Sequence, residues 1–130
     1  LSTVLNALFP TPPRSGPSVM SFFAEPANLI VWIPIGILGG GLVEELERIF
    51  VITRMELWLG RRGLILGVVL TSIMFGLGHL YQGYGSALSS AVSGLLFSAA
   101  YLRRRSALEP MTAHAFSDIL AMTAAMLIAK

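Results

Sequence analysis

Apolar residues form four long runs along the chain, at residues 28–43, 63–81, 85–102 and 110–129. A helix needs about 20 mostly apolar residues to cross a bilayer. The first run reaches that length only if Glu44 and Glu45 are included. The last run begins with Pro110, a residue that suits the first turn of a helix. The pattern predicts an all-α fold, a polytopic membrane helix bundle with about four transmembrane helices.

The segment between the first two runs, residues 46–59, has a different pattern. Charged residues such as Glu47 and Arg54 alternate there with apolar ones. This spacing predicts an amphipathic helix that either lies at the membrane interface or packs inside the bundle.

The first 26 residues hold five of the seven prolines. Proline lacks a backbone N–H and disfavours helix at the residue before it. Residues 1–26 are therefore predicted to be a Pro-rich loop and the end of a preceding segment, with the helical core at 27–130. The chain begins with Leu1, and we expect it to be a fragment of a longer protein with helices upstream. No signal peptide pattern is visible.

Composition agrees with a membrane location. Charged residues make up 12% of the chain and hydrophobic residues 55%, whereas an ordinary soluble domain has about 25% charged residues. The mean hydropathy is +0.75. Disordered chains are poor in apolar residues, and the absence of cysteine excludes a disulfide scaffold. A polytopic membrane protein remains.

The positive charges gather in two loops, Arg61–Arg62 and Arg103–Arg105. Four alternating helices would place both loops on one side, and the positive-inside rule makes that side cytoplasmic. We expect an integral protein of the bacterial cytoplasmic membrane, with membrane lipid as a partner. The formal charge of +2 is not spread as a basic groove, so no nucleic acid partner is expected.

Six ionisable residues on or beside the apolar runs are candidates for chemistry, because such groups cost roughly 2.5–3.5 kcal/mol each inside a membrane helix. They are Glu44, Glu45, Arg48, His79, His114 and Asp118. Pairs four residues apart share a helix face. A carboxylate and two imidazoles can act as general acid and base on water. The same groups could bind zinc and leave a position for water, or the two histidines could bind haem.

Three motifs in order resemble those of the CPBP family, the type II CAAX prenyl endopeptidases and bacteriocin-processing intramembrane proteases. They are the Glu-Glu-Leu-Glu-Arg of residues 44–48, the Phe-Gly-Leu-Gly-His of residues 75–79 and the His-Ala-Phe-Ser-Asp of residues 114–118. The family shows Glu-Glu followed by Arg, then Phe-x-x-x-His, then His-x-x-x-Asn or Asp. The resemblance covers about residues 35–125.

The resemblance implies a role for each matching residue. Glu44 would polarise the attacking water and His79 would assist it, while His114 and Asp118 would orient the substrate carbonyl and stabilise the oxyanion. It favours glutamate-activated water without a tightly held metal; Glu44, His79 and His114 would be the ligands if a metal such as Zn²⁺ is used. Two residues separate Glu45 from Arg48, one fewer than is usual in the family. The catalytic carboxylate is therefore Glu44 or Glu45, with Arg48 as site support.

Each motif also has a structural interpretation. Glu44 and Glu45 could be a solvated helix end, with Arg48 in a surface ion pair. His79 could belong to an interfacial aromatic belt with its neighbouring tyrosines. The pair of His114 and Asp118 could be a hydrogen bond between packed helices.

These interpretations lead to two main hypotheses of function, and a membrane protein that binds haem through His79 and His114 is a third. The first is an intramembrane endopeptidase that acts on a membrane-associated or lipidated peptide or protein. The second is a non-catalytic membrane module, for immunity or scaffolding, that uses the same polar residues to hold its helices together. If the helices are straight, His79 lies ~24 Å from the loop at Arg62. His114 lies only one or two turns from the start of its own helix at Pro110. The enzyme hypothesis therefore predicts a bend at Gly76 or Gly78, a tilted helix, or a loop near Glu109 that dips inward.

Overall fold

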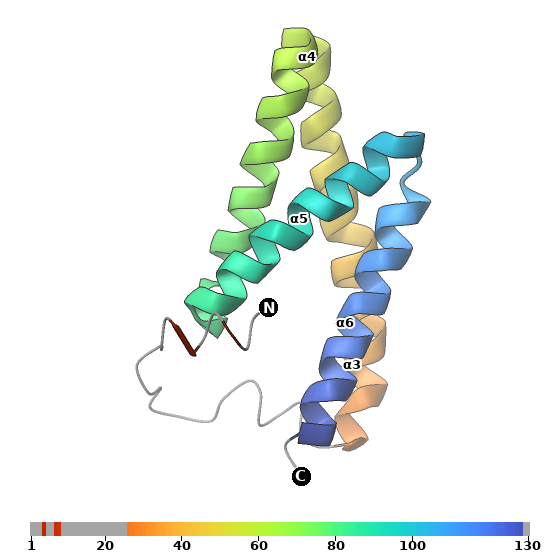
Figure 1. The fold of residues 1–130 in the computed structure, drawn as a ribbon. Helices are drawn as coiled ribbons and strands as arrows, with labels where there is room; N and C mark the ends of the chain where they lie inside the picture. The colour runs from red at the N-terminus through yellow and green to blue at the C-terminus, as the bar shows by residue number, and fades with distance from the viewer. Residues whose placement is uncertain (1–3, 5–6, 9–25, 129–130) are drawn as a thin grey trace. The chain divides into compact units, whose positions relative to one another are not determined.

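A computed structural model describes residues 4, 7–8 and 26–128. The predicted loop at 1–26 lies almost entirely outside these residues. From Pro26 onward the chain forms, in order, η1 (Pro26–Asn28), α3 (Leu29–Ile35), η2 (Gly36–Glu44), α4 (Glu45–Gly78), η3 (Leu80–Gln82), α5 (Tyr84–Arg104) and α6 (Leu108–Ile128) (Figure 1). The described part of the chain contains helices and no strand, so the predicted all-α class is confirmed there.

The first predicted helix and the predicted amphipathic helix form one uninterrupted helical run. It passes from α3 through η2, which is a π-helix, into α4. Pro34 lies inside α3 and cannot donate a backbone hydrogen bond, and the wider π turn begins two residues later. Glu44, Glu45 and Leu46 contain no helix breaker, and both Glu and Leu are good helix formers. The sequence therefore offers no place for a loop between the two predicted helices.

Helix α4 is a hairpin with a sharp turn at Gly60, where φ is 61° and ψ is −142°. A positive φ is open to glycine and costly for most other residues. The two arms touch through small residues: a Cβ added at Gly63 would overlap the Met55 carbonyl oxygen, and one at Gly67 would lie 3.0 Å from Ile52 Cα. Ile52 is fully buried. The amphipathic segment therefore packs against the next helix, which is one of the two predicted arrangements.

Helix α5 returns antiparallel to the second arm of α4. A Cβ added at Gly76 would lie 2.8 Å from Ala91 Cβ, and one at Gly94 would lie 3.1 Å from Ser72 Cα. Such small residues let membrane helices approach closely. The Arg105 guanidinium, just after α5, donates two hydrogen bonds to Glu56, of 2.5 and 2.8 Å. These bonds raise the pKa of Arg105, so its charge is permanent.

The chain divides into two compact units. One is formed by residues 47–105, which contain the α4 hairpin, η3 and α5. The other is formed by residues 26–46 and 106–128, where α6 packs antiparallel to η2. In this second unit Gly36, Gly40 and Gly41 of η2 are buried and meet Asp118, His114 and Ala115 of α6.

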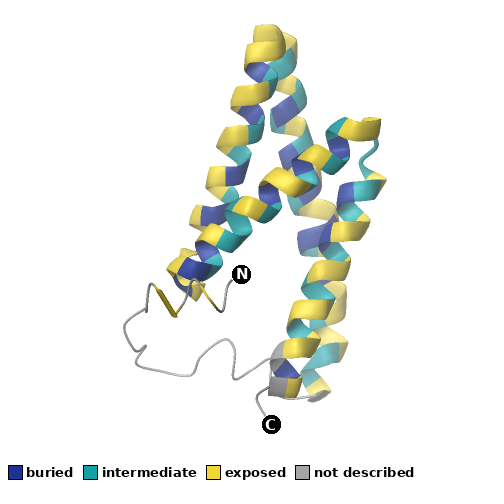
Figure 2. Ribbon diagram, viewed as in Figure 1, coloured by how far each residue is buried: buried dark blue, intermediate teal, exposed yellow. Residues whose placement is uncertain are grey.

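Exposed residues lie along the helices of both units (Figure 2), and many of them are large and apolar. Two described stretches are long and apolar enough to cross a membrane: Leu29–Gln82, which includes the turn at Gly60, and Tyr84–Arg104. An apolar surface of this extent suits contact with lipid. The count of four transmembrane helices stays a prediction.

Candidate active site

A buried hydrogen bond joins the start of α4 to α6. The Nδ1 atom of His114 lies 2.7 Å from Oε1 of Glu45, and the two residues are 3% and 0% exposed. If the carboxylate is ionised it can only accept, and the imidazole then donates from Nδ1. This bond fixes which imidazole nitrogen carries the hydrogen and holds the plane of the ring. It also shows that Glu45 does not belong to a solvated helix end.

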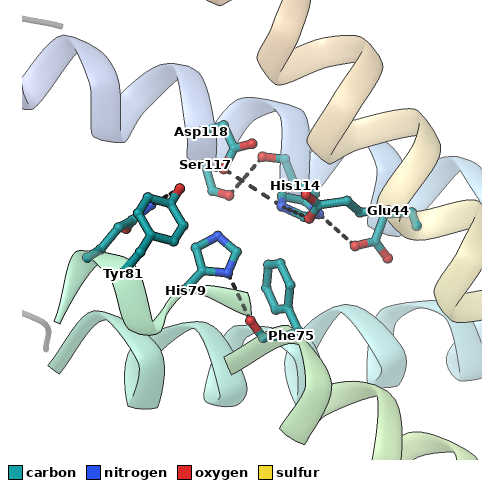
Figure 3. Close-up of polar contacts among 9 residues, drawn as sticks. Glu44, Phe75, His79, Tyr81, His114, Ser117 and Asp118 are labelled. Carbon is teal, nitrogen blue, oxygen red and sulfur yellow. Dashed lines mark hydrogen bonds and ion pairs between the residues drawn. The ribbon is translucent and has the colours of Figure 1, made fainter. Parts of the chain in front are cut away.

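The other imidazole nitrogen of His114 faces two further carboxylates. Its Nε2 lies 3.8 Å from Oε2 of Glu44 and 3.7 Å from Oδ1 of Asp118 (Figure 3). The side chains of Glu44 and Asp118 are 43% and 33% exposed, against 4% for His114. A buried, oriented imidazole therefore presents Nε2 toward two carboxylates that remain accessible. Four of the predicted site residues, Glu44, Glu45, His114 and Asp118, come together in this unit.

The close approach of η2 to α6 depends on Gly40. A Cβ added there would overlap Oδ2 of Asp118 and lie 3.2 Å from Nε2 of His114. At Gly39, the added Cβ would make only an ordinary contact, 3.9 Å from Ile35. Gly40 was not among the predicted site residues. The sequence feature that could have identified Gly40 is its spacing of four from Gly36, which puts both glycines near one face of the helical run.

His79 lies in the other unit, immediately after the end of α4. Its Nδ1 lies 2.9 Å from the Phe75 carbonyl oxygen, which can only accept, so Nδ1 donates. In the neutral ring Nε2 then carries the lone pair and can accept a proton or bind a metal. The ring meets Phe75 edge to face, with centroids 4.7 Å apart, and stacks on Tyr81 at 6.2 Å (Figure 3). The motif spacing of four is the spacing that this hydrogen bond requires.

Arg48 belongs to the same unit as His79, and its side chain is buried, with 4% of the residue exposed. The guanidinium carbon lies 4.6 Å from the ring centroid of Phe75 and 5.5 Å from that of Phe97. Both contacts are cation–π interactions. The interpretation of Arg48 as a surface ion pair is therefore wrong. Phe97 has no motif around it, and no signal in the sequence marked it as the neighbour of Arg48.

Within residues 26–128, no three His, Cys, Asp or Glu side chains are grouped in an arrangement that could hold a metal ion. The chemistry of the candidate donors nevertheless suits a metal. Each histidine donates from Nδ1, one to a carboxylate and the other to a backbone carbonyl. This is the usual second hydrogen bond of a histidine whose Nε2 binds zinc.

Residues 26–120 match the family model described as Type II CAAX prenyl endopeptidase Rce1-like. The matched region contains all three motifs, at residues 44–48, 75–79 and 114–118. A comparison with curated proteins and one with solved structures each find no match.

Proposed function

This chain belongs to the type II CAAX prenyl endopeptidase Rce1-like family, and we propose that it is an intramembrane endopeptidase that hydrolyses a peptide bond in a membrane-associated or lipidated substrate. The predicted membership of the CPBP family is confirmed by the family match. The family is one of proteases, and the match together with the apolar helices makes the chain an integral membrane protein. The roles of individual residues, argued next, are part of the proposal.

Glu44 is the carboxylate that we assign to the attacking water. A general base must reach both water and substrate, and 43% of the Glu44 side chain is exposed. Glu45 is fully buried and accepts the hydrogen bond from His114. Its place suits a residue that positions an imidazole. Exposure and hydrogen bonding thus favour Glu44 in the choice that the sequence left open.

For His79 we keep the role that the family resemblance implies, which is to assist the attacking water. Because its Nδ1 donates to the Phe75 carbonyl, Nε2 can accept a proton from water or return one to the leaving amine. The edge-to-face contact with Phe75 and the stacking on Tyr81 limit rotation of the ring. A fixed ring with a known acceptor nitrogen is what general acid–base catalysis requires.

His114 and Asp118 serve the substrate carbonyl. Nδ1 of His114 is committed to Glu45, so a hydrogen bond to the oxyanion must come from Nε2, which requires the doubly protonated ring. The carboxylates of Glu44, Glu45 and Asp118 lie 3.8, 2.7 and 3.7 Å from the ring nitrogens and would balance the charge of that form. An ionised Asp118 cannot donate to an oxyanion; its role is to orient the imidazole.

The reaction then needs one water. Its oxygen attacks the carbonyl carbon while Glu44 takes one of its protons, and His114 stabilises the negative oxygen of the tetrahedral intermediate. The C–N bond breaks as the proton passes to the amine nitrogen. The products are a carboxylic acid and an amine, and no oxidant or reductant is consumed.

Zinc is the alternative source of activated water. The Nε2 atoms of His79 and His114 and the carboxylate of Glu44 are donors of the type that zinc prefers. A bound zinc ion would lower the pKa of its water. We propose the reaction without a resident metal, since a carboxylate and two oriented imidazoles supply the required proton transfers.

The observation that carries the proposal is the buried bond between Glu45 and His114 beside the accessible Glu44, within the matched region. The test is cleavage of a prenylated peptide ending in a CAAX sequence, in lipid nanodiscs, with the unprenylated peptide alongside. Glu44→Gln should lower kcat at least ~100-fold, the effect expected for a lost general base. The matched control is Glu47→Gln, because Glu47 is exposed and belongs to the same motif; it should retain activity.

Equal cleavage by wild type and Glu44→Gln, both folded, would contradict the enzymatic role of Glu44. If wild type itself cleaves neither peptide while it remains folded, the non-catalytic membrane module becomes the better explanation.

A further inference from the structure

The tip of the α4 hairpin combines exposed apolar and basic side chains. We define the hairpin tip as residues 57–62. Leu57, Trp58 and Leu59 are 73%, 77% and 56% exposed. Arg61 and Arg62 follow the turn at Gly60, and both are exposed. A Leu-Trp-Leu sequence beside two arginines has the polarity of the membrane interface, where tryptophan concentrates and arginine reaches toward phosphate.

The second arginine cluster lies at the same end of this unit. Residues 103–105 are exposed arginines at the end of α5. Arg105 donates both of its terminal N–H groups to Glu56, which lies one turn before Gly60. We call the hairpin tip and residues 103–105 together the basic end. The two segments hold five arginines, and Glu56 is the acidic residue beside them.

Formal charge is absent from the chain between the two clusters. Residues 63–102 contain no Asp, Glu, Lys or Arg. The basic end and the uncharged stretch of residues 63–102 thus belong to one unit, as in a segment that enters lipid and stops at the headgroups. Guanidinium groups bind phosphate oxygens with two hydrogen bonds at once, which an isolated ammonium cannot do.

We propose that the basic end binds the phosphate groups of anionic phospholipids, while Leu57, Trp58 and Leu59 enter the interface beside them. The exposed apolar side chains favour a lipid over a free anion, because a free phosphate would leave them in water. This inference goes beyond the proteolytic function and does not depend on it. It gives the two arginine clusters a ligand in addition to their predicted effect on orientation.

Trp58 allows a direct test. The chain has two tryptophans, so Trp32→Phe leaves Trp58 as its single tryptophan. Brominated phosphatidylglycerol should quench Trp58 fluorescence in nanodiscs at lower mole fractions than brominated phosphatidylcholine does. Each arginine near an anionic surface contributes about a fivefold change in affinity. Arg61→Gln/Arg62→Gln should therefore reduce the preference for phosphatidylglycerol roughly 25-fold.

Two control variants separate charge at the tip from other effects. Arg61→Lys/Arg62→Lys keeps the charge and should keep most of the preference. Arg54→Gln removes one charge from the same unit, but the Arg54 guanidinium lies over Phe50, at 5.2 Å; it should change the preference less than Arg61→Gln.

Equal quenching of Trp58 by the two brominated lipids would overturn the proposal. So would an unchanged preference in the double Gln variant, or loss of the preference when excess inorganic phosphate is added at constant ionic strength, which would indicate a free-anion site. If the double variant does not fold, a salt titration of the Trp32→Phe chain decides. Added NaCl should weaken the preference for phosphatidylglycerol, and a preference independent of salt would contradict the proposal.

Discussion

At the scale of single residues, two adjacent glutamates occupy different environments. Successive helical residues point about 100° apart, so Glu44 and Glu45 cannot share one environment. Glu45 is buried against His114, whereas Glu44 remains partly exposed. Motif spacing could identify the pair of acids but not their roles. The proposed roles follow from which carboxylate the helical run directs toward α6, and motif spacing does not encode that direction.

Glu45→Ala should destabilise the protein more than Glu45→Gln does. Alanine leaves the buried Nδ1–H of His114 without its Glu45 acceptor, which costs about 1–3 kcal/mol. Glutamine keeps an oxygen acceptor and loses only the charge. Thermal unfolding in detergent would measure the difference. Equal melting temperatures for the two variants would show that the hydrogen bond contributes little to stability.

Gly40→Ala should reduce activity, because the new methyl group would displace the Asp118 carboxylate and press on His114. Gly39→Ala is the matched control, since its methyl group would make only an ordinary van der Waals contact. We expect at least ~10-fold lower kcat for Gly40→Ala, because small misplacements of catalytic groups are costly. Peptide cleavage in nanodiscs compares the two. A Gly40→Ala enzyme as active as Gly39→Ala would argue against the close approach.

At the scale of helices, the apolar runs predicted most elements correctly. The predicted run 85–102 is α5 (Tyr84–Arg104), and the run from Pro110 is α6 (Leu108–Ile128). The hairpin was harder to predict. The pattern of residues 46–59 fits both an interfacial helix and a packed one, because a periodic apolar face does not specify what covers it. Gly63 and Gly67 of the next helix cover the apolar face of residues 46–59. Their close backbone contacts are visible only in the three-dimensional structure.

Gly63→Ala should destabilise the hairpin. The added methyl group would overlap the Met55 carbonyl oxygen, which is backbone and cannot rotate away. Gly78→Ala provides the control, because nothing lies within 4 Å of its added Cβ. Overpacking costs typically about 1–3 kcal/mol. Thermal unfolding should show a lower melting temperature for Gly63→Ala and little loss for Gly78→Ala; equal values would contradict the predicted packing.

At the scale of the whole molecule, the sequence supported the family, the membrane location and the helical class. Scarcity of charge made Glu44, His79, His114 and Asp118 conspicuous, and their order along the chain carried the resemblance. Contacts between segments far apart in sequence, such as Arg48 with Phe97, could not be predicted. They depend on which helices pair, and neither periodicity nor spacing encodes that pairing.

Removal of metal ions bears on the whole enzyme. In the proposed reaction, water is activated by Glu44 and His79. Dialysis against EDTA followed by assay in metal-free buffer should therefore leave peptide cleavage within about twofold of the untreated rate, a change below 0.5 kcal/mol in the barrier. Loss of activity that returns on addition of Zn²⁺ would support the zinc alternative instead.

The π-helix at Gly36–Glu44 sets the direction of the site carboxylates. Its hydrogen bonds span five residues where those of an α-helix span four, so a π turn holds one residue more than an α turn. If this stretch became α-helical without a change in length, Glu44 and Glu45 would turn relative to α3 by roughly 100° for each residue that the wider turns no longer hold. Glu45 would then leave the face that meets His114. The site is therefore tied to the backbone hydrogen-bond pattern of this stretch as well as to its side chains.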